Sequence, residues 1–381
     1  MHHLPGEQVW PPVFSCRFSC WRNCRCGRTR LVKTKTEESS VIMASLWDDL
    51  DSLVISPSSA SSTNGERGTI KPKENFDADE DAVALKDAIE GFGTKEKILI
   101  GILTGRSNAQ RQLISKAYEE ATGRTLLKDL KGDTSGDFED LLVALVTPPV
   151  EYVCHEVIKA IKGAGTEDST LIEIFASRTN QEIKAIKDVF FKETEKQLIS
   201  ELEGEVSGDF SKALLVLAEG NRDEGDTVDM EKAKEDAKTL YDAGEKKWGT
   251  DESKFIDILC HRSVPQLKQT FVEYKNISGK TLQQSIEGEM SGELEELLVA
   301  VVKCVKSVPA YFAERLYMSM KGGGTEESIL TRIMVSRSEI DLLDIRADFK
   351  KLYDDSLLSE ISSDLSGEYG ECMKAICGGD D

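Results

Sequence analysis

Apolar side chains recur at helical spacing from about residue 76 to the end of this chain. Four segments carry apolar residues at positions i, i+3 and i+4, a spacing that places all three on one face of an α-helix. No stretch alternates between apolar and polar residues for long enough to predict a β-strand. The pattern therefore predicts an all-α protein. The four apolar triplets are Leu99/Ile102/Leu103, Leu171/Ile174/Phe175, Phe255/Ile258/Leu259 and Leu330/Ile333/Met334.

Each triplet follows a short glycine segment, and the four segments are similar. They read I-E-G-F-G-T at 89–94, I-K-G-A-G-T at 161–166, E-K-K-W-G-T at 245–250 and M-K-G-G-G-T at 320–325. A threonine ends every segment and acidic residues follow closely, which predicts that the threonine is the N-cap of the next helix. The sequence is therefore a fourfold repeat in which each glycine segment precedes a helix.

About five helices are expected in each repeat. One precedes the glycine segment, and the apolar helix after it is followed by a second, a short and a final apolar helix. We place the repeats at 76–147, 148–219, 232–305 and 306–381. The repeats are expected to pack into one body. The polar linker at 220–231 is interpreted as the division between two halves of the molecule.

Two further residues stand at fixed distances from the last glycine of each segment. An arginine follows at one constant spacing: Arg106, Arg178, Arg262 and Arg337. An acid follows at a second, longer spacing, with Ser-Gly shortly beyond it: Asp133, Glu205, Glu289 and Asp364. Because these spacings hold in all four repeats, the glycine segment and the distant acid are interpreted as two parts of one site.

This combination of residues is typical of a calcium site. Glycine permits backbone conformations that turn carbonyl oxygens inward, and Ca²⁺ binds six to eight oxygen atoms. Three carbonyls and a bidentate carboxylate supply roughly five, which leaves room for water or a lipid phosphate. Direct phosphate binding by loop amides is disfavoured because acids follow the threonine and no strand precedes the loop. A purely structural role for glycines and acids is disfavoured by their fourfold repetition.

The net charge also favours a bridging cation. The formal charge of the chain is −21, and residues 1–42 hold seven Lys/Arg and three Asp/Glu, so the remainder carries −25. Such a body is repelled by nucleic acid and by anionic lipid unless a cation lies between them. We therefore expect no nucleic-acid partner. No apolar run approaches the roughly 18 residues that would predict a membrane span.

Residues 1–75 do not share the repeat pattern. Residues 1–42 are basic, hold four of the nine cysteines and resemble neither a secretory signal nor a zinc site. We expect a disordered extension, or translation that starts at Met43. Residues 43–75 are rich in serine and are expected to form a flexible tail. The other five cysteines lie mostly in apolar stretches, which predicts free thiols in a reducing compartment.

Candidate catalytic groups are scarce, so no enzyme activity is expected. The repeats contain only two histidines, His155 and His261. The pair His155-Glu156 lacks the second histidine of a zinc-protease helix. His261 and its neighbour Cys260 point to different sides of a helix, so they do not form a nucleophile–base pair. The alternative function is a helical-repeat scaffold that binds proteins independently of calcium.

The glycine segment, the acid-x-Ser-Gly element, the Arg-Ser/Thr pair and the five-helix repeat together resemble the annexin family over roughly residues 76–381. The resemblance implies calcium-dependent binding to anionic phospholipid membranes by a cytoplasmic protein that is recruited reversibly when calcium rises. It also implies hindrance of phospholipases by covering their substrate, and a role in membrane traffic or repair. The implied calcium ligands are the carbonyls of Ile89, Gly91 and Gly93 with Asp133; of Ile161, Gly163 and Gly165 with Glu205; and of Met320, Gly322 and Gly324 with Asp364.

The third repeat departs from this pattern because Lys247 stands where the others have their first glycine. The resemblance implies that carbonyls of Gly244, Lys247 and Gly249 serve there with Glu289. Lys247 would also attract anionic lipid. Trp248 at the tip of this segment would either enter the headgroup layer or pack under the loop.

Other residues take more open roles. Trp47 would anchor the N-terminal tail, which in the family also binds protein partners, or it is a solvated tail residue. For the four arginines, the family suggests buried ion pairs between repeats, and surface salt bridges are the alternative. Val153 stands where some annexins have the hinge acid of a central channel, which weakens an ion-conduction interpretation.

Overall fold

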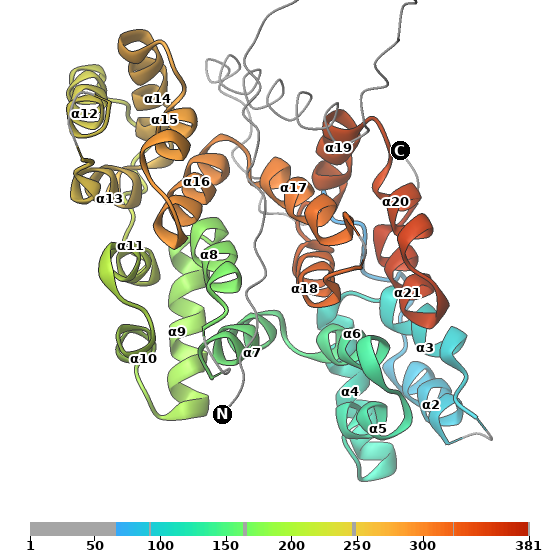
Figure 1. The fold of residues 1–381 in the computed structure, drawn as a ribbon. Helices are drawn as coiled ribbons and strands as arrows, with labels where there is room; N and C mark the ends of the chain where they lie inside the picture. The colour runs from blue at the N-terminus through green and yellow to red at the C-terminus, as the bar shows by residue number, and fades with distance from the viewer. Residues whose placement is uncertain (1–65, 91–92, 163–165, 246–248, 323, 380–381) are drawn as a thin grey trace, which may run out of the picture.

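The computed structural model describes residues 66–90, 93–162, 166–245, 249–322 and 324–379. These ranges contain twenty α-helices and no β-strand, which confirms the predicted all-α fold (Figure 1). The extension 1–42 and Trp47 lie outside the described residues. None of the helices in the described ranges is both long and apolar enough to cross a membrane.

Each repeat contains five helices, as expected. The first contains α2 (Ala78–Ile89), α3 (Glu96–Thr104), α4 (Asn108–Thr122), α5 (Leu126–Asp133) and α6 (Gly136–Val146). The second contains α7 (Pro149–Lys162), α8 (Asp168–Ser177), α9 (Asn180–Thr194), α10 (Leu198–Glu205) and α11 (Gly208–Ala218). The third contains α12 (Met230–Ala243), α13 (Glu252–His261), α14 (Val264–Ser278), α15 (Leu282–Glu289) and α16 (Glu293–Lys306). The fourth contains α17 (Val308–Met320), α18 (Glu327–Arg337), α19 (Leu342–Tyr353), α20 (Leu357–Asp364) and α21 (Gly367–Cys377).

Side-chain caps define the start of the third helix in the first three repeats. Ser107 and Thr179 each accept a hydrogen bond from the backbone amide three residues later, and Ser263 caps α14 in the same way. In α4 and α9 a side chain also bonds back to the cap amide, forming capping boxes. These caps satisfy amides that have no partner within the helix.

The predicted threonine caps of the second helices are wrong. The N-cap is one residue later in every repeat, and none of these four residues makes a side-chain capping bond. The threonine hydroxyls of three repeats instead contact the distant acids. The observed N-caps are Lys95, Glu167, Asp251 and Glu326.

The apolar triplets all lie in one hydrophobic core. Every one of their twelve side chains is buried, which confirms the helical face predicted from their spacing. The five cysteines of the repeats are also buried and form no disulfide, as predicted for free thiols. Burial raises the pKa of four of them to about 12: Cys154, Cys260, Cys304 and Cys372.

The repeats are arranged as two halves that do not follow chain order (Figure 1). Helix α16 of repeat 3 packs on α8 and α11 of repeat 2, whereas α18 and α21 of repeat 4 pack on α6 and α3 of repeat 1. The linker 220–231 therefore lies within one half, and the predicted division at this linker is wrong. Because the fourth repeat returns to the first, the molecule also differs from an open solenoid, where a repeat contacts only its sequence neighbours.

The last part of the predicted tail is held against repeat 4. The Ile70 amide donates to the carbonyl oxygen of Ser338 at 3.0 Å, and the Ile70 side chain is buried. Arg67 forms an ion pair with Asp344 at 2.8 Å. A Cβ atom at Gly68 would lie 2.6 Å from the backbone of the loop that it crosses, so only glycine fits there. The structure thus differs from the predicted flexible tail at residues 67–70.

Candidate calcium-binding loops

Each glycine segment forms a loop between the first and second helices of its repeat, closed by one backbone hydrogen bond. The amide after the threonine donates to a carbonyl near the end of the first helix, at 2.8–3.1 Å. In repeats 1, 2 and 4 the donor and acceptor are separated by the same number of positions. In repeat 3 the separation is one position greater, so the third loop is longer. The bonds join Lys95 to Ala88, Glu167 to Ala160, Asp251 to Ala243 and Glu326 to Ser319.

This closure places the first predicted ligand of each loop at one equivalent position. Ile89, Ile161, Gly244 and Met320 each directly follow the acceptor of the closing bond. Gly244 therefore occupies in the longer third loop the place that an Ile or Met occupies in the others. Gly91, Gly163, Gly165, Lys247 and Trp248 lie outside the described residues.

The last glycine of the first and third loops has a backbone conformation that favours glycine. Gly93 has φ +83° and Gly249 has φ +87°. These values lie in the left-handed region, which residues with a Cβ atom rarely adopt. The glycines are thus required by the path of the loop.

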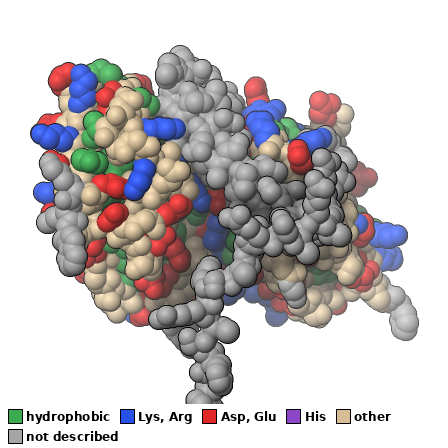
Figure 2. All heavy atoms as spheres, turned by 45° about the horizontal axis from the view of Figure 1, so that its top comes forward, with side chains coloured by type: hydrophobic (Ala, Val, Ile, Leu, Met, Phe, Trp, Pro, Cys, Tyr) green, Lys and Arg blue, Asp and Glu red, His purple; other side chains and the backbone are tan. Residues whose placement is uncertain are grey.

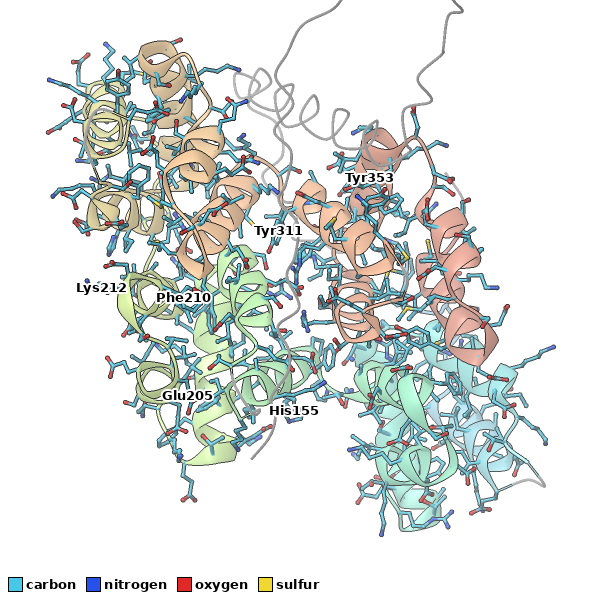
Figure 3. The ribbon with its side chains drawn as sticks, in the orientation of Figure 1. His155, Glu205, Phe210, Lys212, Tyr311 and Tyr353 are labelled. Carbon is cyan, nitrogen blue, oxygen red and sulfur yellow. The ribbon has the colours of Figure 1, made fainter. Side chains whose placement is uncertain are left out.

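The four distant acids occupy the same structural position. Each is the last residue of the short fourth helix of its repeat, and each is exposed: Asp133, Glu205, Glu289 and Asp364. Figure 3 labels Glu205 on α10. A carboxylate at the C-terminal end of a helix faces the negative end of the helix dipole, which is unfavourable. Helix stability therefore does not explain these acids, whereas a cation bound beside them would.

The structure brings three of these acids onto their loops. The Thr94 hydroxyl lies 3.3 Å from the carbonyl oxygen of Asp133 and 3.5 Å from its carboxylate. The Thr250 hydroxyl donates to the backbone carbonyl oxygen of Glu289 at 3.3 Å, and the Thr325 hydroxyl donates to the carboxylate of Asp364. In repeat 2 the corresponding residues, Thr166 and Glu205, are both described, and no hydrogen bond joins them. Sequence reasoning assigned the threonines to capping and missed this role, although the constant spacing from loop to acid was the signal.

Two loops are also tied to a neighbouring helix connection by an ion pair that the sequence analysis did not single out. Arg124, between α4 and α5, contacts the carboxylate of Glu90. Lys280, at the equivalent place between α14 and α15, lies 2.8 Å from Glu245. The hydrogen bond from Lys280 lowers the pKa of Glu245. These contacts hold loops 1 and 3 close to the helices that carry the acids.

The ligand chemistry fits calcium better than zinc. Among the described residues, no group of three or more His, Cys, Asp or Glu side chains is placed to hold a metal ion. A metal bound at a loop must therefore take most of its ligands from backbone carbonyls, with one carboxylate. Carbonyl and carboxylate oxygens are the ligands of Ca²⁺, whereas zinc sites are built from Cys and His side chains.

The four arginines form neither of the predicted arrangements, buried ion pairs between repeats or surface salt bridges. Arg106 pairs with buried Asp81 at 2.6 Å, and Arg262 pairs with Asp236 at 2.8 Å. Arg337 also pairs within its own repeat. These pairs are largely buried and lie within repeats, not between them. Arg178 forms no ion pair with any described residue.

A buried ionic cluster joins the two halves instead. Glu173 on α8 is fully buried and accepts hydrogen bonds from Arg332 on α18, at 2.8 and 3.0 Å, and from Arg315 on α17, at 3.0 Å. Arg332 also contacts Glu156 at 3.1 Å. Burial by itself would raise the pKa of Glu173, but the two arginines outweigh it and lower the pKa to about 2. Tyr311, which Figure 3 labels between the halves, is buried near this cluster.

Four five-helix repeats that each carry a glycine loop and a distant acid define a class of helical proteins with repeated cation-binding loops. The family model described as Annexin matches residues 80–145, 152–217, 235–301 and 311–376. The chain therefore belongs to the annexin family, whose members are non-enzymatic proteins that bind phospholipids in a calcium-dependent manner.

Individual relatives agree with this assignment. Human annexin A3 is 56% identical over 317 residues, which cover 83% of this chain and 98% of that protein. Annexin A5 of Gallus gallus is 50% identical over 315 residues, or 83% of this chain and 98% of that protein. The solved structure of annexin III matches with a TM-score of 0.81 and 55% identity, over 84% of this chain and 100% of that one. A calcium-bound structure of annexin (Sm)1 matches with a TM-score of 0.72 and 36% identity, over 83% of this chain and 95% of that one.

Proposed function

We propose that this protein docks on anionic phospholipid membranes through calcium ions held at its four loops, and that it is a cytoplasmic protein recruited reversibly when calcium rises. The contact between loop threonine and distant acid, made in repeats 1, 3 and 4, is the observation that carries the proposal, and it extends to repeat 2 by the constant spacing. It places an acidic residue beside the loop at the surface, and no cluster of side-chain ligands among the described residues would complete the coordination. The remaining positions are then available to a lipid phosphate.

Each site would combine three carbonyls with one acid. The first carbonyl is supported by the equivalent placement of Ile89, Ile161, Gly244 and Met320. The other carbonyls are carried over from the family pattern. The proposed sets are Ile89, Gly91, Gly93 and Asp133; Ile161, Gly163, Gly165 and Glu205; Gly244, Lys247, Gly249 and Glu289; and Met320, Gly322, Gly324 and Asp364.

Electrostatics explain why calcium is needed. Outside residues 1–42 the chain carries −25. On the face drawn in Figure 2, acidic side chains are interspersed with basic ones, and no broad basic surface is visible. A phosphatidylserine surface would repel such a body, and a Ca²⁺ ion shared between a loop and a lipid phosphate removes that repulsion locally.

Sedimentation with liposomes tests the proposal. With calcium, the full chain is expected to pellet with phosphatidylserine-containing liposomes and to stay in the supernatant with phosphatidylcholine alone. A chelator should release the bound protein, because the bridging ions are removed. Equal pelleting with and without calcium would instead favour the alternative, a helical-repeat scaffold that binds independently of calcium.

Lys247 and Trp248 are proposed to contact lipid directly, on the strength of their place in the longest loop. In a Trp248→Ala variant, the calcium needed for half-maximal liposome binding is expected to rise about threefold to tenfold, because an aromatic ring stabilises insertion at the headgroup layer. Calcium titration of pelleting measures this change. Trp248→Phe, which keeps an aromatic ring, should stay within about twofold of the unchanged protein. An unaltered titration for Trp248→Ala would mean that the ring packs under the loop.

Two consequences follow from docking. A protein layer on the membrane would hinder phospholipases by covering their substrate, and reversible docking suits a role in membrane traffic or repair. Both depend on the liposome binding tested above and would be lost with it. Trp47 as an anchor of the tail, and a protein partner for that tail, rest on residues outside the described part of the chain and stay predictions from the family resemblance.

A further inference from the structure

A cavity of about 330 Å³ lies where repeats 2 and 3 meet, away from the calcium loops. Helix α8 begins beside the second loop and ends at Ser177, and the cavity lies at this far end. Two arginines and a group of valines line it. They are Arg178, Arg222, Val264, Val301, Val305 and Val308.

Arg178 brings an unpaired positive charge to this cavity. Its guanidinium donates hydrogen bonds to the hydroxyls of Ser177, at 2.8 Å, and Ser336, at 3.3 Å, and it stacks on the ring of Phe312 at 5.7 Å. No described carboxylate forms an ion pair with it. Burial, together with the nearby charge of Arg337, lowers the pKa of Arg178. Arg178 is partly buried, and the carboxylates of Glu182 and Glu173 act on its charge without forming an ion pair with it. A desolvated guanidinium that has no ion pair is stabilised by an anion that reaches it.

Comparison of the repeats explains why Arg178 is unpaired. In repeat 1 the equivalent arginine pairs with Asp81, which lies on α2, the first helix of that repeat. Repeat 3 has the same pair, with Asp236 lying on its first helix, α12. In repeat 2 the corresponding position on the first helix, α7, is Val153, which is buried and cannot neutralise a charge. The internal carboxylate partner is therefore missing in this repeat.

A second arginine of the cavity is also without a carboxylate. Arg222 donates to the carbonyl oxygens of Leu259, at 2.8 Å, and Arg262, at 2.9 Å, and forms no ion pair with a described residue. Burial lowers its pKa as well. The N-terminal ends of α9 and α14, at Asn180 and Val264, line the same cavity and add the positive ends of two helix dipoles.

The rest of the lining limits which anion fits. Val301, Val305 and Val308 form an apolar wall, whereas the exposed acids Asp223, Glu224 and Asp226 also line the cavity. These acids repel any anion, and they repel a multiply charged anion such as phosphate more than a single carboxylate. A single carboxylate on an apolar stem satisfies both parts of the lining, since its chain contacts the valines.

We propose that this cavity binds a free aliphatic carboxylate of medium chain length, with its oxygens at Arg178 and its chain along the valines. Neither calcium nor a membrane takes part in the interaction. The site is therefore independent of the function proposed above, and its failure would leave that function untouched.

Isothermal titration of the full chain with octanoate, below its micelle concentration and in chelator, tests the proposal. Octanoate is expected to bind, whereas octanol, which lacks the charge, and inorganic phosphate, which lacks the chain, should bind at least about tenfold more weakly. Equal binding of octanol and octanoate would overturn the role of the arginines. Absence of octanoate binding would overturn the proposal as a whole.

Variants at Val153 supply the sharpest control. Val153→Asp restores the acid found in repeats 1 and 3, so Arg178 gains an internal partner and octanoate affinity should fall about tenfold or more. Val153→Asn has the same shape as the Asp variant without the charge and should keep octanoate affinity within about threefold.

Two variants of the cavity lining test the site directly. Arg178→Gln should lose octanoate binding, and Val301→Phe should block it by filling the cavity. Circular dichroism and thermal unfolding identify variants that do not fold. Equal affinities of the Asp and Asn variants would contradict the assignment.

A competing peptide tests whether the chain itself supplies the carboxylate that binds in the cavity. Residues 43–55 of this chain carry acids beside apolar residues and lie outside the described structure. If a peptide of this sequence displaced octanoate and its Asp→Asn version did not, the natural occupant would be the chain itself, and the assignment to a free carboxylate would be overturned. Failure of both peptides to displace octanoate supports the free carboxylate.

Discussion

Replacing Asp133, Glu205, Glu289 and Asp364 together by Asn is expected to abolish calcium-dependent binding to phosphatidylserine liposomes. Each site loses its only charged ligand, and calcium affinity depends strongly on ligand charge, so the calcium needed for half-maximal pelleting should rise by about 100-fold or more. The fold should not suffer, because each acid is exposed and faces the negative end of a helix dipole. The thermal unfolding temperature without calcium is therefore expected to stay the same or to rise.

A charge-matched control separates ligand loss from the change in net charge. Four exposed acids that lie before or in the N-terminal part of α2 or α12, whose loops follow their C-terminal ends, are changed to Gln in one variant: Glu74, Glu80, Glu224 and Glu235. This variant gains the same positive charge and should pellet at least as well as the unchanged protein. If both quadruple variants bound calcium-dependently and equally well, the four acids would not be calcium ligands, and the bridging mechanism would be wrong.

The Glu173→Gln variant is expected to lose about 3 kcal/mol of stability at neutral pH, because a Gln side chain keeps the shape but removes the charge that pairs with both arginines. Buried Arg332 then keeps only its contact with Glu156, and partly buried Arg315 loses its carboxylate partner. Glu173 is fully buried between Arg332 and Arg315, and these arginines lower its pKa from the ordinary 4.5 to about 2. A group whose pKa is lowered on folding stabilises the folded state above the unfolded pKa. Urea unfolding at neutral pH measures the loss.

The pH dependence gives this prediction its control. In the unchanged protein, the contribution of Glu173 is complete above pH 4.5 and is lost as the pH falls towards about 2. The difference in stability between the protein and the Glu173→Gln variant should therefore shrink over this range. Glu156→Gln, at a partly exposed partner of Arg332, should cost less than Glu173→Gln at neutral pH. A difference that stays constant as the pH falls through this range would show that the charge of Glu173 does not contribute.

Much of the fold could be predicted because the signals are local and repeated. The spacing of Leu99, Ile102 and Leu103 determines which helix face is buried, and this pattern holds in every repeat. The constant spacing between Gly93 and Asp133 pointed to one site, and the contact of Thr94 with Asp133 agrees. Thr94 itself was misassigned, because a threonine before a helix is ordinarily a cap, and only the position of α5 showed what its hydroxyl reaches.

The features that the sequence did not determine depend on contacts between distant repeats. The amino-acid pattern established four all-helical repeats and their order, and it predicts the pairing of each loop with an acid. The association of repeat 4 with repeat 1, the burial of Glu173 between the halves and the cavity beside Arg178 were decided by tertiary structure alone. Helix periodicity is set by neighbours within a few residues and recurs in the sequence. The choice of which apolar faces pack together depends on the three-dimensional shape of complete repeats. That shape produces no periodic pattern in the sequence.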